Sequence, residues 1–243
     1  MDAMKYLSLF ILITSLLTSF TVSADAAENN DDITRLKQAL ARSLPNVVPS
    51  KISVTPVTGL YEVIVGSQVV YMSIDARYMI EGDLIDLITK TNVSENAKSA
   101  IRLTAIEQLG ADNMLVYKPK EAKDTITVIT DINCTYCRRL HSEIPVYLKN
   151  DVEVRYVFMS ERGSGAGMKK TISVWCSDDQ QLALDIAKAG GKVEDKTCDN
   201  PISLHSALAR DLGVRGTPAI ILEDGQLLPG YVPADKLIAQ IRK

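Results

Sequence analysis

The sequence of 243 residues is poor in several features that would mark a specialised class of protein. Lys and Arg number 27 against 30 Asp and Glu, the net charge is −3, and no stretch is dominated by one sign. Nucleic-acid binding usually shows as a clustered basic patch, and charged tails show as long runs of like charge. We therefore expect no nucleic-acid partner. The hydrophobic fraction of 46% is that of an ordinary globular protein.

Long apolar runs are also scarce, since the one clear run is Tyr6–Phe20 near the N-terminus. It follows Lys5 and precedes several small residues, which is the order of a secretory signal. A retained membrane anchor is the alternative, but the run is short for a span of about 20 residues. We predict a signal peptide over residues 1–24, cleaved after Ala24 or Ala26, and therefore an exported protein.

Cysteine is rare as well: the chain has 4, which are Cys134, Cys137, Cys176 and Cys198. Four cysteines allow three pairings, and an even number in an exported protein indicates disulfides. The distant Cys176 and Cys198 most simply pair with each other as a structural bond. The alternative, a second redox relay, has no C-x-x-C spacing to support it.

The pair Cys134 and Cys137 has the C-x-x-C spacing of redox-active dithiols. Two cysteines three positions apart at the start of a helix lie on one face, within reach of a disulfide. At a helix N-terminus the unpaired amides and the helix dipole stabilise a thiolate. We predict that Cys134 attacks a substrate disulfide and that Cys137 resolves the mixed disulfide, with Tyr136 between them tuning the pair.

Other uses of a C-x-x-C motif fit less well. A zinc site would need two more ligands, and His141 is the one nearby candidate. A c-type haem would need His after the second cysteine, where Arg138 stands. A plain structural disulfide is the remaining alternative. We predict no metal site and no cofactor other than the redox-active Cys134–Cys137 pair.

Periodicity divides the mature chain into an N-terminal unit, a linker and a larger C-terminal domain. Residues 27–31 are a predicted loose start. Residues 28–90 form a predicted α+β unit, with a helix from Asp32 and short strands after it. A unit this small buries little surface, so we expect it to serve in dimerisation. Residues 91–124 form a predicted linker helix and connector.

The predicted catalytic domain covers residues 125–243. Strands and helices alternate along it, which favours an α/β fold. We predict strands over 126–130, 152–159, 219–222 and 227–228, and helices over 134–148 with an interruption at Pro145, 168–176, 179–189, 201–213 and 233–241.

Several motifs together resemble a known family. The stretch Thr130–Cys137 resembles the active-site segment of bacterial periplasmic disulfide isomerases of the DsbC/DsbG type, in the thioredoxin superfamily. The likeness covers nearly all of the mature chain. It extends to Arg139-Leu140-His141, Val174-Trp175-Cys176, Gly216-Thr217-Pro218-Ala219 and Leu228-Pro229-Gly230-Tyr231.

The resemblance implies an architecture. This is a thioredoxin-like fold with a helical insertion, preceded by a small α+β (cystatin-like) dimerisation domain and a linker helix. It implies a cis peptide at Thr217-Pro218 facing the cysteine pair, with Thr217, Pro218 and Tyr136 binding substrate. It also implies a structural Cys176–Cys198 bond and a V-shaped homodimer in the periplasm.

The implied function is that of a disulfide isomerase or reductase acting on misfolded or misbonded exported proteins, with a membrane-bound thiol reductase as electron donor. Alternatives are a DsbG-like chaperone (holdase), a thiol-protecting reductase and a dithiol oxidase. Thr135 departs from the Gly or Pro that such relatives carry there, and this residue bears on the balance among these activities.

Overall fold

The structure is a computed structural model that describes residues 23–159 and 165–242. They form two compact units, which divide between Gly82 and Asp83. Most of the predicted signal peptide lies outside the described residues, and the predicted domain boundary at residue 90 stays a prediction. Within the described ranges, no helix has both the length and the hydropathy needed to cross a membrane.

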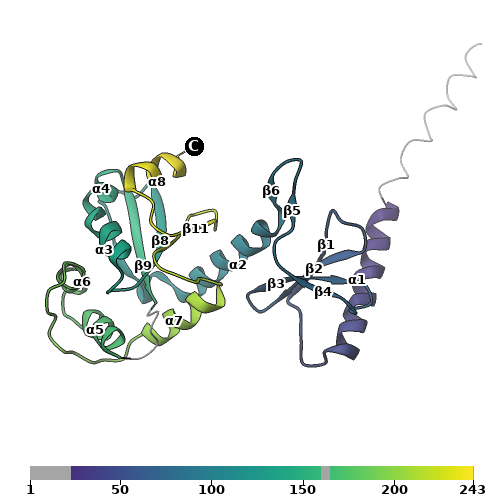
Figure 1. Cartoon of the computed structure of the whole chain (residues 1–243), viewed down its shortest axis with the longest axis horizontal. Coiled ribbons are helices and arrows are strands. Elements are labelled where there is room, and N and C mark those ends of the chain that lie inside the picture. Colours follow the sequence, from purple (N-terminus) through teal and green to yellow (C-terminus); the bar gives the residue numbers. More distant parts are fainter. Residues whose placement is uncertain (1–22, 160–164, 243) are drawn as a thin grey trace, which may run out of the picture. The chain divides into compact units, whose positions relative to one another are not determined.

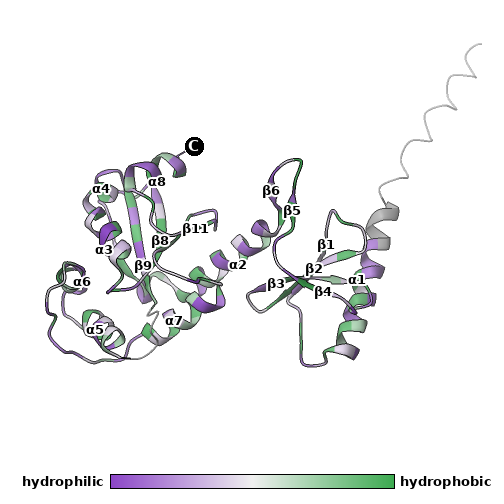
Figure 2. Cartoon of the chain, in the orientation of Figure 1, coloured by the Kyte–Doolittle hydropathy of each residue, from purple (hydrophilic) through white to green (hydrophobic). Residues whose placement is uncertain are grey.

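The N-terminal unit consists of one helix and a four-stranded antiparallel sheet in the order β1-β2-β3-β4 (Figure 1). The helix α1 is amphipathic, as its alternating colours in Figure 2 show. Its Leu36 and Leu40 pack with Val63 and Met72 of the sheet into one buried cluster. The elements are α1 (Ser23–Ser43), β1 (Lys51–Val54), β2 (Leu60–Val65), β3 (Gln68–Ser73) and β4 (Met79–Glu81).

The prediction of a loose start at residues 27–31 was wrong, because α1 already begins at Ser23. The segment before Asp32 contains several alanines and neither Gly nor Pro. Alanine has the highest helix propensity, so the helix continues through these residues although they carry no apolar stripe. The hydrophobic periodicity therefore predicted only the part of α1 from Asp32 onward.

The second unit is built on a five-stranded sheet in the order β11-β10-β8-β9-β7, in which β8 and β9 are parallel and the other pairs antiparallel. The central strands are buried on both faces. The elements are β5 (Ile85–Asp86), β6 (Thr91–Asn92), α2 (Val93–Leu109), η1 (Ala111–Asn113), β7 (Leu115–Tyr117), β8 (Asp124–Thr130), α3 (Thr135–Ser142), α4 (Ile144–Lys149), β9 (Val152–Phe158), α5 (Ala166–Trp175), α6 (Gln180–Lys188), α7 (Ile202–Asp211), β10 (Ala219–Ile221), β11 (Leu227–Pro229) and α8 (Ala234–Ile241).

The expected alternation of strands and helices is present, with two differences. The predicted helix 134–148 is divided at Glu143 into α3 and α4, and Pro145 lies in the first turn of α4. Proline fits there because first-turn amides have no partner within the helix. The hairpin β5–β6 and the edge strand β7 were not predicted, since two or three residues are too few to show an alternating pattern.

The helix α2 is fastened to the turn between β10 and β11. The guanidinium of Arg102, which is buried, pairs with Glu95 and donates a hydrogen bond of 3.0 Å to the carbonyl of Gly225. A side chain at residue 225 would meet the Ser99 carbonyl oxygen at 2.4 Å, and Gly225 also has a φ of +81°. Only glycine allows this turn to lie so close to α2.

One histidine, His205 on α7, lies wholly inside this unit. Its ring stacks on Phe158 and makes an edge contact with Trp175. The ring nitrogen Nδ1 accepts the Phe158 N–H at 3.3 Å, so the single proton of the neutral ring lies on Nε2, which donates to the Asn113 carbonyl. Burial lowers the pKa of His205, and the hydrogen bond to Asn113 opposes that effect only in part.

A first prediction concerns acid stability. Because the pKa of His205 is lower in the folded chain than the value of about 6.5 for an exposed histidine, its stabilisation is complete above that pH and is lost as the pH falls. Each such histidine contributes up to about 1.4 kcal/mol per pH unit to this loss. We expect His205→Gln to make the unfolding free energy depend less steeply on pH between pH 6.5 and 5. Urea unfolding followed by Trp175 fluorescence measures this dependence. An unchanged slope would contradict the argument.

A second prediction concerns the disulfide that joins Cys176 at the end of α5 to Cys198 before α7. These cysteines are 22 residues apart, with Cα atoms 5.6 Å from each other. A cross-link over a loop of this size restricts the unfolded chain and contributes about 3 kcal/mol. Replacing both by serine should lower the unfolding free energy by about that amount in urea melts followed by circular dichroism. A loss below about 1 kcal/mol would mean that this loop, even without the cross-link, keeps residual structure in the unfolded chain.

Candidate functional site

The carboxyl end of β8, the amino end of α3 and the start of β10 meet at one edge of the sheet. The antiparallel register pairs Ala219 with Ile129, so the residue pair just before β10 lies beside the turn that follows β8. That pair is Thr217-Pro218, whose peptide bond is cis. The register therefore places Thr217 next to Cys134, although 83 residues separate them in the sequence.

Cys134 is the N-cap residue of α3 and is partly exposed. Its sulfur accepts a hydrogen bond from the amide of Cys137 at 3.4 Å, and its thiol donates to the Thr217 carbonyl at 3.2 Å. Burial alone would raise the pKa of this thiol, but the hydrogen bonds from Cys137 and its neighbours outweigh burial and lower the pKa. Cys134 is thus the more easily ionised of the two thiols.

Cys137 lies one turn deeper in α3 and is buried. Its sulfur accepts a hydrogen bond of 3.5 Å from the Asp131 amide. Burial raises the pKa of the Cys137 thiol, and the positive charge of Lys188 is the largest of the effects that oppose this rise. Burial thus acts in the same direction on both thiols, but hydrogen bonds outweigh it at Cys134 and not at Cys137, so the pKa of Cys134 is lowered and that of Cys137 is raised.

Lys188, the last residue of α6, is buried behind this pair. Its ammonium group donates hydrogen bonds to the Thr130 hydroxyl at 2.7 Å and to the Asp131 carbonyl at 2.9 Å. It also lies 6.0 Å from the centre of the Tyr156 ring. Burial lowers the pKa of Lys188 to about 8, against the opposing effect of Cys137 and Asp131.

His141 on α3 joins the same buried region. Its Nδ1 lies 3.1 Å from the Tyr156 hydroxyl and its Nε2 lies 2.9 Å from a carboxylate oxygen of Asp185 on α6. Asp185 also accepts a 2.6 Å hydrogen bond from Tyr117. Burial lowers the pKa of His141, and the nearby Lys188 lowers it further. His141 is thus fixed by protein partners that tie α3 to α6.

On the exposed side of the cysteines, Tyr136 stacks on Tyr231 with ring centres 6.2 Å apart. The Arg139 guanidinium lies 4.9 Å from the centre of the Tyr231 ring, and the Tyr231 hydroxyl donates to Glu143. Tyr136 nevertheless remains 58% exposed. The two tyrosines therefore form an aromatic surface beside Cys134, and contacts of Tyr231 with Arg139 of α3 and with Glu143 between α3 and α4 hold it in place.

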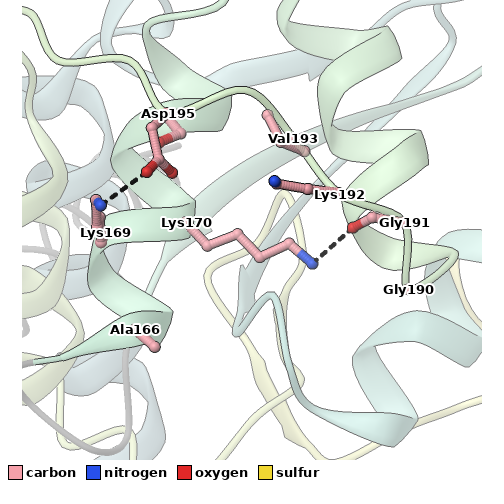
Figure 3. A pocket seen from close by; sticks show the side chains of 9 residues that line it. Ala166, Lys169, Lys170, Gly190, Gly191, Lys192, Val193 and Asp195 are labelled. Carbon is pink, nitrogen blue, oxygen red and sulfur yellow. Dashed lines mark hydrogen bonds and ion pairs between the residues drawn. The ribbon is translucent and has the colours of Figure 1, made fainter.

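A hollow of about 370 Å³ lies between α5 and the segment after α6 (Figure 3). Two of its three lysines have partners, since Lys169 pairs with Asp195 and Lys170 donates to the carbonyls of Ala187 and Gly191. Lys170 thereby caps the carboxyl end of α6 and fixes the helix end that carries Lys188. Within the described ranges, no group of three or more His, Cys, Asp or Glu side chains could hold a metal.

The sequence-predicted site residues Cys134, Cys137, Thr217, Pro218 and Tyr136 all lie at this one edge of the sheet. Cys176 and Cys198 form their bond elsewhere in the unit.

Sequence reasoning missed Lys188 and the His141 partners. A signal for Lys188 exists, because it continues the buried stripe Ala183, Leu184 and Ala187 of α6, where a lysine is unusual. The Asp185–His141 pairing has no comparable local signal.

Two family models match the chain. A thioredoxin-like domain covers residues 111–243, and a disulfide bond isomerase protein N-terminal domain covers residues 21–95. These matches confirm the predicted thioredoxin-like fold preceded by a distinct N-terminal domain.

Relatives of known name and solved structures are similar to this chain as well. The thiol:disulfide interchange protein DsbC of Dickeya dadantii is 34% identical over 98% of this chain and 94% of its own, and that of Escherichia coli K12 is 35% identical over 94% and 92%. The disulfide interchange protein from Neisseria gonorrhoeae superposes with a TM-score of 0.50 at 26% identity, over 55% of this chain and 96% of that one. A linker-deletion mutant of Proteus mirabilis ScsC, at 21% identity, shares the fold with a TM-score of 0.51 over 64% and 88%.

The near full-length similarity and the matched pair of domains fit the dithiol at the head of α3. The chain therefore belongs to the DsbC family of thiol:disulfide interchange proteins and is a thiol–disulfide isomerase and oxidoreductase.

Proposed function

We propose that Cys134 is the nucleophile of this enzyme and Cys137 the resolving thiol. The observation that carries this assignment is the contrast between a partly exposed Cys134 with a lowered pKa and a buried Cys137 with a raised one. The Cys134 thiolate attacks a substrate disulfide, forming a mixed disulfide and releasing one substrate thiolate. In isomerisation, that thiolate attacks another disulfide of the substrate, and the substrate thiolate released there displaces Cys134 from the mixed disulfide, which rearranges the substrate bonds. In reduction, Cys137 attacks Cys134 and leaves the substrate reduced.

Thr217, Pro218 and Tyr136 form the proposed substrate-binding surface. The Thr217 carbonyl lies 3.2 Å from the Cys134 sulfur at the start of β10, so an extended substrate segment that pairs with this backbone would present its disulfide to Cys134. The stacked Tyr136 and Tyr231 rings offer an apolar contact for the side chains around that disulfide.

The proposed working place is the periplasm, and the substrates are exported proteins with wrong disulfides. The signal-like N-terminus supports export. Isomerisation needs Cys134 reduced, so an electron donor is required, for which we propose a membrane-bound thiol reductase. The dithiol itself serves as the redox group, without a further cofactor.

Residues 28–90 are the proposed dimerisation domain. The edge strand β4 presents Met79 and Ile80 to solvent, 59% and 55% exposed, next to Tyr78 at 61%. An apolar strand edge that is left open is a site for pairing with another chain. A second copy would cover it and enlarge the small core of this unit.

The third prediction tests the cysteine roles. In refolding of a scrambled multi-disulfide protein with a small thiol as reductant, the rate with Cys134→Ser should fall to the rate without enzyme, because the remaining Cys137 thiol is buried and has a raised pKa. Cys137→Ser should still attack and accumulate a mixed disulfide that is visible on non-reducing gels.

Loss of refolding in Cys134→Ser with retained suppression of aggregation would add a holdase role to the redox one. Unchanged refolding by Cys134→Ser would overturn the proposed function. Rapid oxidation of dithiol substrates without isomerisation would instead favour a dithiol oxidase.

The fourth prediction tests the dimer. Sedimentation of the mature chain should give twice the monomer mass. Ile80→Asp places a charge on the β4 edge and should give monomers, whereas Val48→Asp, at a position 79% exposed in the same unit, should leave the dimer intact. A monomeric wild-type chain would refute the proposal.

A further inference from the structure

The buried Lys188 lies behind the cysteine pair and takes no part in the reaction proposed for Cys134 and Cys137. It ends α6 on the face that packs inward, and only 4% of its surface is exposed. Burying an ammonium group is costly unless it is paired or performs a task. The groups that accept its hydrogen bonds, the Thr130 hydroxyl and the Asp131 carbonyl, are both neutral.

Those partners lead directly to Cys137. The Thr130 hydroxyl accepts from Lys188, so its own proton is free to point at the Cys137 sulfur, and its hydrogen bond to that sulfur helps to lower the pKa of the thiol. Asp131 accepts from Lys188 through its carbonyl and donates to the same sulfur through its amide, at 3.5 Å. Two short paths therefore connect the ammonium group with the sulfur.

We propose that Lys188 is a positioning residue for the resolving cysteine: its buried ammonium group, bridged by the Thr130 hydroxyl, stabilises the thiolate that Cys137 forms when it closes the Cys134–Cys137 disulfide. This inference rests on the proposed function, in which Cys137 resolves the mixed disulfide. Lys188 touches neither substrate nor the bond that breaks, so it acts through Thr130 and through its charge.

The step is balanced without any further reactant. The Cys137 thiolate attacks the Cys134 sulfur, the bond between Cys134 and the substrate sulfur breaks, and a Cys134–Cys137 bond forms. The substrate sulfur leaves as a thiolate and takes up the proton that Cys137 has lost. The protein dithiol is oxidised by two electrons and the substrate disulfide is reduced by the same two.

The charge of Lys188 is present when the step needs it. Burial lowers its pKa to about 8, so the ammonium form predominates at neutral pH and is lost above that value. Each element packed around Lys188 brings a titratable or charged group. These are Arg138 and His141 of α3, with Cys134 at its head and Cys137 within it, Lys170 of α5, Tyr117 of β7, Tyr156 of β9, Asp131 after β8, and Asp185 of α6 itself.

The fifth prediction separates the two cysteine steps in one experiment. The reduced full-length protein is mixed with an aromatic disulfide that releases the coloured nitrothiobenzoate anion. Attack by Cys134 releases the first anion and resolution by Cys137 releases the second, so stopped-flow absorbance gives a rate for each step. The variants are Lys188→Met, Thr130→Val and the matched control Lys169→Met, which removes a surface charge from α5.

Lys188→Met should raise the pH midpoint of the second phase by about one to two units. Its rate at pH 7 should fall about threefold to tenfold, because a more basic thiolate is rarer but more nucleophilic. Thr130→Val should shift the second phase in the same direction. The first phase should change less than the second in both variants, and Lys169→Met should leave both phases unchanged.

Superposable second-phase pH profiles of wild type and Lys188→Met would overturn the inference, whatever happens to thermal stability. A wild type whose second phase is absent, or persists in Cys137→Ser, would instead contradict the proposed function. If Lys188→Met does not fold, isotope-edited NMR of wild-type lysines decides. The Lys188 pKa should fall when the cysteine pair is oxidised and no thiolate remains, and an unchanged value would refute the proposal.

Discussion

The antiparallel register between β8 and β10 controls where the reactive groups of this protein lie. Because Ala219 pairs with Ile129, the chain entering β10 passes the turn from which α3 begins. The Thr217 carbonyl and the Cys134 sulfur then meet at 3.2 Å. A shift of one residue would turn every β10 side chain to the other face and withdraw that carbonyl. The geometry of the site is therefore fixed by the sheet core rather than by a loop.

The two sulfurs owe their difference to helix geometry. Residues at i and i+3 share a face, but the first stands at the cap, where free amides point outward, and the second stands one turn inward. Cys134 thereby receives hydrogen bonds that lower its pKa, whereas burial raises that of Cys137. A single C-x-x-C motif thus yields an attacking thiol and a protected one, and this difference determines which of the two reacts first.

The sequence was informative where structure is local. The C-x-x-C spacing, the helix after it and the alternation of strands and helices follow from short-range patterns, and the structure has them. The placement of Thr217 beside Cys134 came only from the family resemblance, since no local signal brings distant residues together. Lys188 and Asp185 could not be assigned, because their partners lie on β8 and α3 and depend on how α6 packs. The length of α1 was underestimated for a different reason, since helix propensity extends it beyond the residues that show hydrophobic periodicity.

The position of α6 connects the structural disulfide with the redox pair. Cys176 ends α5 and Cys198 precedes α7, so the loop that their bond closes contains the whole of α6. That helix supplies Asp185 to His141 and Lys188 to the region behind Cys137. Lys170 caps its carboxyl end, where Lys188 is the last residue. A bond that restricts this loop therefore also restricts the groups that set the electrostatics of the buried thiol. The two cysteine pairs are chemically separate, and α6 makes them physically dependent.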